Sequence, residues 1–318
     1  MKFELMIKHE DKLYVPAVPD GVKWETDRKG SPGKLTFSVI IDKELKLTEG
    51  DNVRLTVDDT GIFNGFAFSK SRDKQNLVQV TAFDQLRYLC NKDTYVYRDK
   101  TASEVIKMVA DDFSLQLGTI EDTSFKIGFR YEDNLSLFDI IYNALDLELS
   151  NTEKMYVLYD DFGKLTLKSL DSMKVDVLID EATGENFDYS STINDETYNK
   201  VKLYFDSKKK KREAFSVEHE ENIKSWGVLQ LTDKVKEGED GKSKADAMLK
   251  MHNVKTRRLK INKARGDVRV RAGCMVNVKL ELGDVSVNNY MTVERCEHTF
   301  GESEHWMDLT LKGGEING

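Results

Sequence analysis

The sequence has 318 residues, of which 39% are hydrophobic and 33% are charged, and its mean hydropathy is −0.53. This length suits two or three domains, and no apolar run approaches the roughly 20 residues of a transmembrane helix. The net charge of −8 disfavours stable nucleic-acid binding, and the isolated Cys90, Cys274 and Cys296 argue against a disulfide framework or a zinc knuckle.

Residues 1–90 have the pattern of an antiparallel β-meander. The first ten residues alternate and carry charge, so they lack the apolar centre of a signal peptide, and we expect assembly in a cytoplasm. All prolines lie in the first 32 residues, which suits a strand-rich body because proline cannot donate to a sheet. Apolar residues alternate from Leu35 onward, and 58–61 is expected to be a turn. We expect a first small barrel.

Residues 91–185 predict a compact α+β unit. Thr101 and Glu104 form a capping box at the start of a helix over 101–113, and a second amphipathic helix is expected over 136–145. Two alternating runs, 155–159 and 164–167, flank a short loop in which Gly163 takes the left-handed position of a hairpin.

Residues 186–318 repeat a sequence pattern of residues 1–90. Strands resume at Lys200, and a helix at 243–257 places apolar residues on one face and is expected to pack on a barrel flank. The string Val268-x-Val270-x-x-Gly273-x-x-Val276-x-Val278 reproduces Leu45-x-Leu47-x-x-Gly50-x-x-Val53-x-Leu55. The expected fold is mainly β with an inserted α+β unit: two related small antiparallel β-barrels, 1–90 and 186–318, flank a central helix–helix–hairpin domain, 91–185.

The candidate chemistry is sparse. The carboxylate pairs Asp58–Asp59 and Asp160–Asp161 lie between alternating strands, where aspartates serve turns. A ligand-like cluster could hold a metal, or it could be a hairpin with solvent-facing polar residues; its members are Cys296, His298, Glu302, Glu304 and His305. No hydrolase, metalloprotease, P-loop or dinucleotide motif is present, so we expect no catalytic residue, cofactor or metal.

Two places are candidates for an interface. The basic run that contains Lys208 and Arg212 could contact an acidic partner, although strand-like residues on both sides favour a solvated hairpin tip. Trp226 could anchor a protein contact or pack in a core.

Together, these segments resemble the XkdQ-type tail proteins of contractile prophages and phage-tail-like bacteriocins. The resemblance covers nearly the whole chain and lies in the order of its motifs: Asp84–Leu89, the helices at 101–113 and 136–145, Tyr159–Gly163, Trp226–Gln230, Val293–His298 and Met307–Leu309. No spike β-helix or wall-degrading domain is recognisable within the 318 residues, so the resemblance predicts that other chains supply them.

The resemblance implies a baseplate hub, similar to the first module of the type VI secretion spike protein. Such a hub is a homotrimer whose two barrels per chain form a ring of six. Its partners would be the tail tube protein, a spike or spike-adaptor protein, other baseplate proteins and a tape-measure protein, with no stable nucleic-acid or membrane binding. It would lie in the baseplate of a virion or tail-like particle assembled in the bacterial cytoplasm. The alternatives are a tail-associated cell-wall hydrolase that uses the cluster of Cys296, His298 and His305, and a monomeric β-rich binding module.

Overall fold

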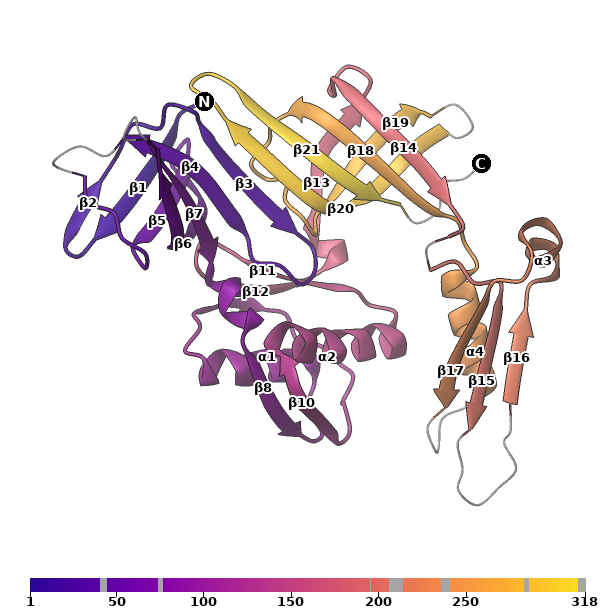
Figure 1. Ribbon diagram of the computed structural model, residues 1–318. Coiled ribbons are helices and arrows are strands. Elements are labelled where there is room, and N and C mark those ends of the chain that lie inside the picture. The colour runs from indigo at the N-terminus through magenta and orange to yellow at the C-terminus, as the bar shows by residue number, and fades with distance from the viewer. Residues whose placement is uncertain are drawn as a thin grey trace. The chain divides into compact units, whose positions relative to one another are not determined.

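The computed structural model describes residues 1–40, 45–73, 77–194, 196–205, 214–235, 241–282 and 286–313. The chain divides into two compact units: the first combines Met1–Asp188 with Lys260–Gly318, and the second is Tyr189–Leu259. Strands dominate the structure, as the sequence predicts (Figure 1). Among the described residues, no helix is both long and apolar enough to span a membrane.

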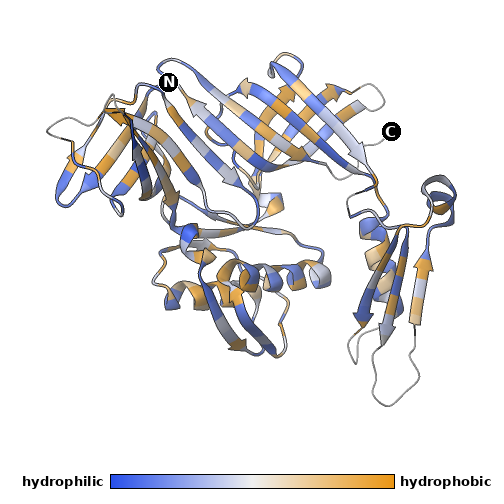
Figure 2. Ribbon diagram, viewed as in Figure 1, coloured by the Kyte–Doolittle hydropathy of each residue, from blue (hydrophilic) through white to orange (hydrophobic). Residues whose placement is uncertain are grey.

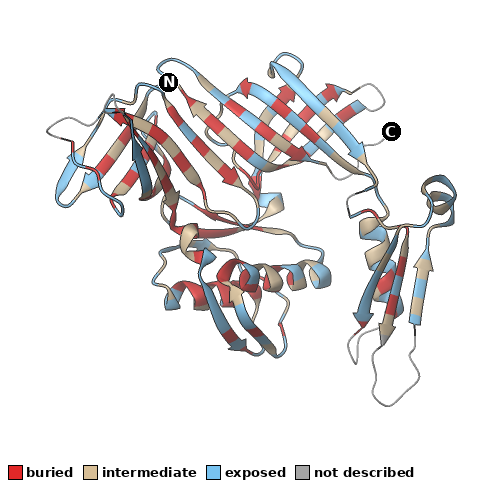
Figure 3. Cartoon of the chain, in the orientation of Figure 1, coloured by how far each residue is buried: buried red, intermediate tan, exposed pale blue. Residues whose placement is uncertain are grey.

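The first half of the large sheet is built from the N-terminal residues. Its strands have the spatial order β3-β4-β7-β6-β5-β1-β2 and pair antiparallel. Their bounds are β1 Phe3–His9, β2 Lys12–Tyr14, β3 Val22–Asp27, β4 Lys34–Ile40, β5 Asn52–Val57, β6 Thr60–Arg72 and β7 Leu77–Asp84. Hydrophobic and polar residues alternate along these strands (Figure 2), so that one face of the sheet is buried (Figure 3).

The second half of the large sheet repeats this order as β14-β18-β21-β20-β19-β13. Its strands are β13 Lys174–Asp180, β14 Asn186–Thr192, β18 Thr256–Arg265, β19 Met275–Glu281, β20 Ser286–Phe300 and β21 His305–Lys312. Position by position, β3, β4, β7, β6, β5 and β1 correspond to β14, β18, β21, β20, β19 and β13. One difference is that β13 pairs parallel with β19, whereas β1 is antiparallel to β5.

The two halves are open sheets rather than the closed barrels expected from the sequence. In the first half, the outer edge of β3 pairs with β20, so it is not available to β1. In the second half, the described part of the sheet path ends at β14, which pairs with β18 and not with β13. The pairing therefore joins one half to the other instead of closing each half on itself.

The central segment carries the expected helices and hairpin. Its elements are η1 Gln85–Cys90, β8 Lys92–Tyr97, α1 Ala102–Asp112, β9 Leu117–Ile120, β10 Arg130–Ser136, α2 Leu137–Thr152, β11 Tyr156–Asp160, β12 Leu165–Ser169 and η2 Leu170–Met173. The capping box of Thr101 and Glu104 is present. The second helix extends to Thr152, beyond the expected end at Leu145, because Glu148 is buried on its inner face and accepts hydrogen bonds from the Ser124 and Phe125 N–H groups.

The second unit has its own small core. Its elements are β15 Lys200–Phe205, β16 Ala214–Glu218, α3 Glu220–Trp226, β17 Gln230–Val235 and α4 Gly241–His252. The strands form a separate sheet in the order β16-β15-β17, and Ala245 of α4 is buried with Val201 and Leu203. The expectation that this helix packs on a barrel flank is therefore wrong. It also ends at His252 rather than at Arg257, because residues from Thr256 belong to β18.

Candidate functional site

The glycines of the sequence repeat occupy equivalent positions in the two halves of the large sheet. Gly50 and Gly273 have φ values of 93° and 91°, a region that side chains rarely adopt. In the first half, the Gly50 N–H donates to the Ala67 carbonyl at 2.8 Å, and the Ala67 N–H donates to the Asp51 carbonyl at 2.9 Å. In the second half, the Gly273 N–H donates to the Val293 carbonyl at 2.8 Å, and the Val293 N–H donates to the Cys274 carbonyl at 2.9 Å. The short sequence repeat is therefore also a repeat of backbone geometry.

A shared β-bulge follows this contact. The pairing of β6 with β7 shifts register between Ala67 and Ser69, and the pairing of β20 with β21 shifts between Val293 and Arg295. The matching bulges make residues 69–72 of β6 equivalent to residues 295–298 of β20. A bulge at the same place in both halves extends the correspondence from strand order to individual residues.

Beyond the bulge, side chains of both halves also cap equivalent carbonyls. Lys70 Nζ donates to the Leu47 carbonyl at 2.6 Å, and His298 Nε2 donates to the Val270 carbonyl at 2.7 Å. Leu47 and Val270 are matching positions of the sequence repeat. The two carbonyls are equivalent but the two donors are not, since Lys70 corresponds to Cys296 and His298 corresponds to Arg72.

The second half of β20 forms a seam with β3. The antiparallel register runs from Arg295 opposite Asp27 to Phe300 opposite Val22. Ion pairs line the exposed face of this seam, and their partners are Arg28 with Glu294, Lys23 with Glu297, and Arg295 with Glu25. Through this seam, β-strands of the two halves form one continuous sheet.

The β11–β12 hairpin contacts both halves at once. At its tip, Phe162 and Gly163 have φ values of 49° and 87°, as a type I′ turn requires, which confirms the hairpin expected around Gly163. The Phe162 ring lies against Gly61 of β6, with ring carbons 2.7 Å from where a Cβ would stand. At the other end of β11, a Cβ on Gly273 would collide with Val157. Because Gly61 and Gly273 have no side chain, the hairpin can pack against both halves of the large sheet.

Asp160 serves its own turn, as the sequence predicts, whereas the Asp58 side chain bonds a residue outside its turn. Asp160 Oδ1 accepts the Gly163 N–H at 2.6 Å, and Asp58 Oδ1 accepts the Lys2 N–H at 2.8 Å. Asp58 and Asp59 both have positive φ and form the loop themselves, so Gly61 is a strand residue rather than part of the turn.

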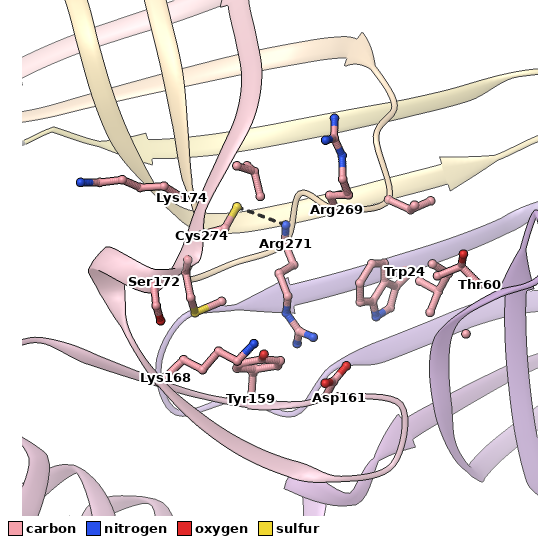
Figure 4. A pocket seen from close by; sticks show the side chains of 15 residues that line it. Trp24, Thr60, Tyr159, Asp161, Lys168, Ser172, Lys174, Arg269, Arg271 and Cys274 are labelled. Carbon is pink, nitrogen blue, oxygen red and sulfur yellow. Dashed lines mark hydrogen bonds between the residues drawn. The ribbon is translucent and has the colours of Figure 1, made fainter. Parts of the chain in front are cut away.

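A cavity of about 330 Å³ lies where the hairpin and the two halves of the sheet meet (Figure 4). Its wall combines Trp24 of β3 with Tyr159 of β11 and Arg271 of the loop before Gly273. The Arg271 guanidinium lies 4.2 Å from the Tyr159 ring centroid and 5.7 Å from the Trp24 ring centroid. Its Nη1 donates to the Asp160 carbonyl at 2.8 Å. Arg271, which belongs to the second half of the large sheet, therefore contacts both the first half, through Trp24, and the hairpin, through Tyr159 and Asp160.

Two buried carboxyl groups lie within the electrostatic reach of Arg271. Asp84, 3% exposed, accepts the N–H groups of Gly33 and Leu86 at 2.9 and 3.0 Å. Burial, followed by the nearby Asp160, raises the pKa of Asp84 well above its ordinary value, and Arg271 opposes that rise. Burial also raises the pKa of Asp160, against the opposing effects of the Gly163 N–H and Arg271. The guanidinium thus partly offsets the burial that raises the pKa values of these two carboxyl groups.

The structure brings together three members of the predicted Cys/His cluster. His298 is fully buried; its Nε2 lies 3.1 Å from Cys296 Sγ, and its Nδ1 lies 2.8 Å from His305 Nε2. Because the Val270 carbonyl can only accept, His298 carries its proton on Nε2, so Nδ1 accepts from His305 Nε2–H. Burial raises the pKa of the Cys296 thiol well above its ordinary value. The cluster is a chain of neutral hydrogen-bonding groups.

The other two members of the predicted cluster lie elsewhere. Glu302 and Glu304 are exposed in the loop before β21, and Glu304 accepts a hydrogen bond from the Trp306 indole at 3.0 Å. Within the described residues, no group of three or more His, Cys, Asp or Glu side chains has an arrangement that could hold a metal. The absence of a metal stays a prediction for the whole chain.

We expect this histidine pair to make the protein less stable in acid. Burial lowers the pKa of His298 to about 3 and that of His305 to about 4, whereas an unfolded histidine titrates near 6.5. Stability is therefore complete above about pH 6.5 and is lost as the pH falls toward these folded values, because the unfolded chain binds protons first. For His298 alone, the loss at pH 5 relative to pH 8 is about 2 kcal/mol. Denaturant unfolding at both pH values should show this loss, and His298→Met should remove it. Titration of the His298 imidazole itself near pH 6.5 in the folded protein, followed by NMR, would contradict its lowered pKa.

The two interface candidates have different outcomes. Trp226 is the last residue of α3 and is half-buried, and α3 has no fully buried residue. Lys208 and Arg212 lie outside the described residues. Whether any of these residues contacts a partner stays a prediction.

Comparison with known proteins places the chain in a family. The family model described as YqbQ-like matches residues 22–312. The chain belongs to the YqbQ-like family. It is 29% identical to the uncharacterized protein YqbQ of Bacillus subtilis, with coverage of 97% of this chain and 96% of that protein. It is 27% identical to XkdQ of the phage-like element PBSX of the same organism, over 95% of this chain and 94% of XkdQ. The resemblance to XkdQ-type proteins is confirmed.

Solved structures share the fold of this YqbQ-like chain. A 43 kDa tail protein of Shewanella oneidensis prophage MuSo2 is similar with a TM-score of 0.71 at 11% identity, over 97% of this chain and 98% of that one. An Escherichia coli component of the type VI secretion system is similar with a TM-score of 0.57 at 9% identity, over 99% of this chain and 78% of that one. That component is described as structurally similar to tail proteins of bacteriophage T4.

Sequence reasoning missed the residues that join the parts of this YqbQ-like chain. Arg271 and Asp84 lie 187 positions apart and carry no spacing signal. Asp84 is the N-cap of η1, so its position before a short helix was the only sequence feature that indicated a structural role for it. The ion pairs of the β20–β3 seam likewise join residues from opposite ends of the sequence.

Proposed function

We propose that this YqbQ-like protein is the structural hub of a contractile tail baseplate. The observation that carries the proposal is the repeat of strand order, glycine geometry and bulge position in the two halves of the large sheet. Three chains with two related halves each supply six near-equivalent sheets around a central channel. Such a trimer can face a six-fold tail tube on one side and a three-fold spike on the other.

The relatives support a role in a tail. XkdQ belongs to a phage-like element, and proteins of the same fold are tail proteins of prophages and a type VI secretion component.

The partners in this proposal are a homotrimer of this chain, the tail tube protein, a spike or spike adaptor, other baseplate proteins and a tape-measure protein. Trp226, Lys208 and Arg212 are proposed contacts to such partners. The proposed functional divisions stay 1–90, 91–185 and 186–318.

The charge of the chain suits a channel through which DNA passes. With a net charge of −8, the surface as a whole repels a polyanion. We propose that acidic side chains outnumber basic ones on the channel wall, and that the protein has no stable nucleic-acid or membrane binding.

We propose no catalytic role. A hydrolase that used Cys296 would need a thiolate and an accessible base, but the thiol is fully buried and its pKa is raised. His298 is fully buried, and both of its ring nitrogens are within hydrogen-bonding distance of protein groups.

The proposal is tested by deleting the gene in a strain that produces the particle. Electron microscopy of the purified material should show no complete tails after deletion, and complete tails again when the wild-type chain is supplied. An epitope-tagged chain should be labelled at one end of the tail only. Complete tails in the deletion strain, or label along the whole tail, would contradict a hub.

A further inference from the structure

We propose that the cavity between the β11–β12 hairpin and the two halves of the large sheet binds an acidic side chain from a peptide segment of a different protein. The inference deepens the proposed hub, on which it rests for the presence of partner proteins in the tail. The cavity itself is formed by one chain, so the isolated protein is sufficient to test the binding site.

The lining of this cavity is basic, although the chain as a whole is acidic. Among the described residues that line it, the cationic side chains are Lys168, Lys174, Arg269 and Arg271, and the acidic side chain is Asp161. Four cations and one carboxylate leave the lining with a formal charge of +3, whereas the chain carries −8. A local excess of positive charge attracts an anion even to a protein of negative net charge.

Two of these cations have a carboxylate of their own, and two do not. Arg269 and Lys174 each form an ion pair with an aspartate two or three residues earlier in the chain, at 2.6 and 3.5 Å. Within the described parts of the chain, neither Lys168 nor Arg271 forms an ion pair. Figure 4 shows the Lys168 amine and the Arg271 guanidinium pointing into the space beside Tyr159. Like charges that converge in this way repel each other, and an anion bound between them removes that repulsion.

The Arg271 guanidinium is held in place and has donors to spare. The Tyr159 ring lies 4.2 Å from it and the Trp24 ring 5.7 Å, which restricts its movement. Its Nη1 donates to the Asp160 carbonyl at 2.8 Å, but Nε and Nη2 have no hydrogen-bond partner among the described residues. A carboxylate accepts two parallel hydrogen bonds from a guanidinium, so it is the anion that this side chain recognises best.

The rest of the lining suits a peptide better than a free ion. Apolar side chains form much of the wall: Trp24, Ile62, Met173, Val175 and Val268. A volume of about 330 Å³ lies at the lower end of the range for ligand sites, about 300 to 1,000 Å³, and holds a few side chains. A hydrated ion would leave the apolar wall unused, and the net charge of −8 repels a nucleic acid. An acidic residue flanked by apolar ones uses both kinds of lining.

Calorimetry of the full-length chain tests the site with a capped tetrapeptide that has two glutamates between two leucines. We expect saturable binding that weakens about tenfold or more when glutamines replace the glutamates. Lys168→Met should weaken binding of the glutamate peptide by a similar factor, whereas Lys168→Arg, which keeps the charge, should retain it. Because Lys168 forms no ion pair with the described residues, Lys168→Met should leave the urea midpoint unchanged.

Lys164→Met is the matched control, since Lys164 is exposed on the same hairpin and is not part of the cavity lining. This variant loses the same charge and should bind the peptide as wild type does. No saturable binding, equal affinity for the two peptides, or equal losses from the two lysine variants would overturn the inference. Displacement of the peptide by an equal concentration of inorganic phosphate would assign the cavity to a free anion. Binding of a single-stranded oligonucleotide that Lys168→Met abolishes would assign it to nucleic acid.

The purified tail gives a second test, because a carbodiimide joins a lysine amine to a carboxylate in direct contact with it. Mass spectrometry should find Lys168 cross-linked to an aspartate or glutamate of a different tail protein. A cross-link to Asp161 of the same chain, or to another copy of this chain, would show that no separate partner fills the cavity. Failure of peptide binding by the isolated chain would reject the site and leave the hub in place, whereas complete tails in the deletion strain would reject the hub.

Discussion

Replacing Arg271 by methionine should lower the free energy of unfolding by about 1 to 3 kcal/mol at pH 8. Methionine keeps an apolar stem against Tyr159 and Trp24 but removes the charge and the hydrogen bond to the Asp160 carbonyl. The buried Asp84 and Asp160 are then left without the cation that lowers their pKa values. The cost follows because an unpaired buried carboxylate must either stay charged or take up a proton.

The pH dependence of this effect has a definite sign. The folded pKa values of Asp84 and Asp160 are raised, so their penalty is absent below the unfolded value of 3.8 and grows as the pH rises through the folded values. The difference between wild type and Arg271→Met should therefore shrink as the pH falls toward 4. Urea unfolding across this range measures it.

Arg269→Met is the matched control, since Arg269 lies two residues away and pairs with Asp267 at the surface. It should leave the urea midpoint almost unchanged. Equal losses from the two variants, or a loss for Arg271→Met that grows in acid, would show that Arg271 does not act through the buried carboxylates.

Gly273→Ala should destabilise the protein by about 2 to 5 kcal/mol. The φ of 91° places an alanine in strain worth about 1 to 2 kcal/mol, and its Cβ would collide with Val157 of the hairpin. Crowding of that kind adds about 1 to 3 kcal/mol when the neighbour cannot move.

Gly50→Ala is the control that the repeat itself supplies. Gly50 has almost the same φ, 93°, but a Cβ there meets nothing within 4 Å. It should cost the backbone strain alone, about 1 to 2 kcal/mol. The excess at Gly273, measured by thermal or urea unfolding, reports the docking of the β11–β12 hairpin; equal costs at the two glycines would mean that the hairpin does not press on this loop.

The sequence predicts local features of this fold well. The capping box at Thr101 and the turn around Gly163 follow from short-range chemistry, and both are present. The repeat around Gly50 and Gly273 was visible because positive φ and a buried strand pattern constrain residue types at fixed spacing. Alternation and a hairpin predict that Cys296, His298 and His305 lie close together, which is confirmed. The expectation that the polar residues of this hairpin face solvent is wrong for Cys296 and His298, which are both 0% exposed because β3 covers β20.

What the sequence could not show is long-range. The pairing of β20 with β3 joins residues 268 to 278 positions apart, and the strands carry no sequence pattern that identifies their partners. The separate sheet β16-β15-β17 and the helices α3 and α4 lie in the chain between β14 and β18, whereas a short loop joins the equivalent β3 and β4. In the sequence, strands β15, β16 and β17 resemble a continuation of the second half, because alternation predicts that a segment is a strand but not which sheet the strand joins. For the same reason, helix α4 was assigned to the wrong sheet.

A reconstruction of the purified tail at the level of its baseplate, averaged with no more than three-fold symmetry, tests the central claim most directly. We expect three copies of this chain, with the first and second halves of the large sheet alternating at the same radius around the channel. Any other copy number, or the two halves at different radii from the tail axis, would contradict it.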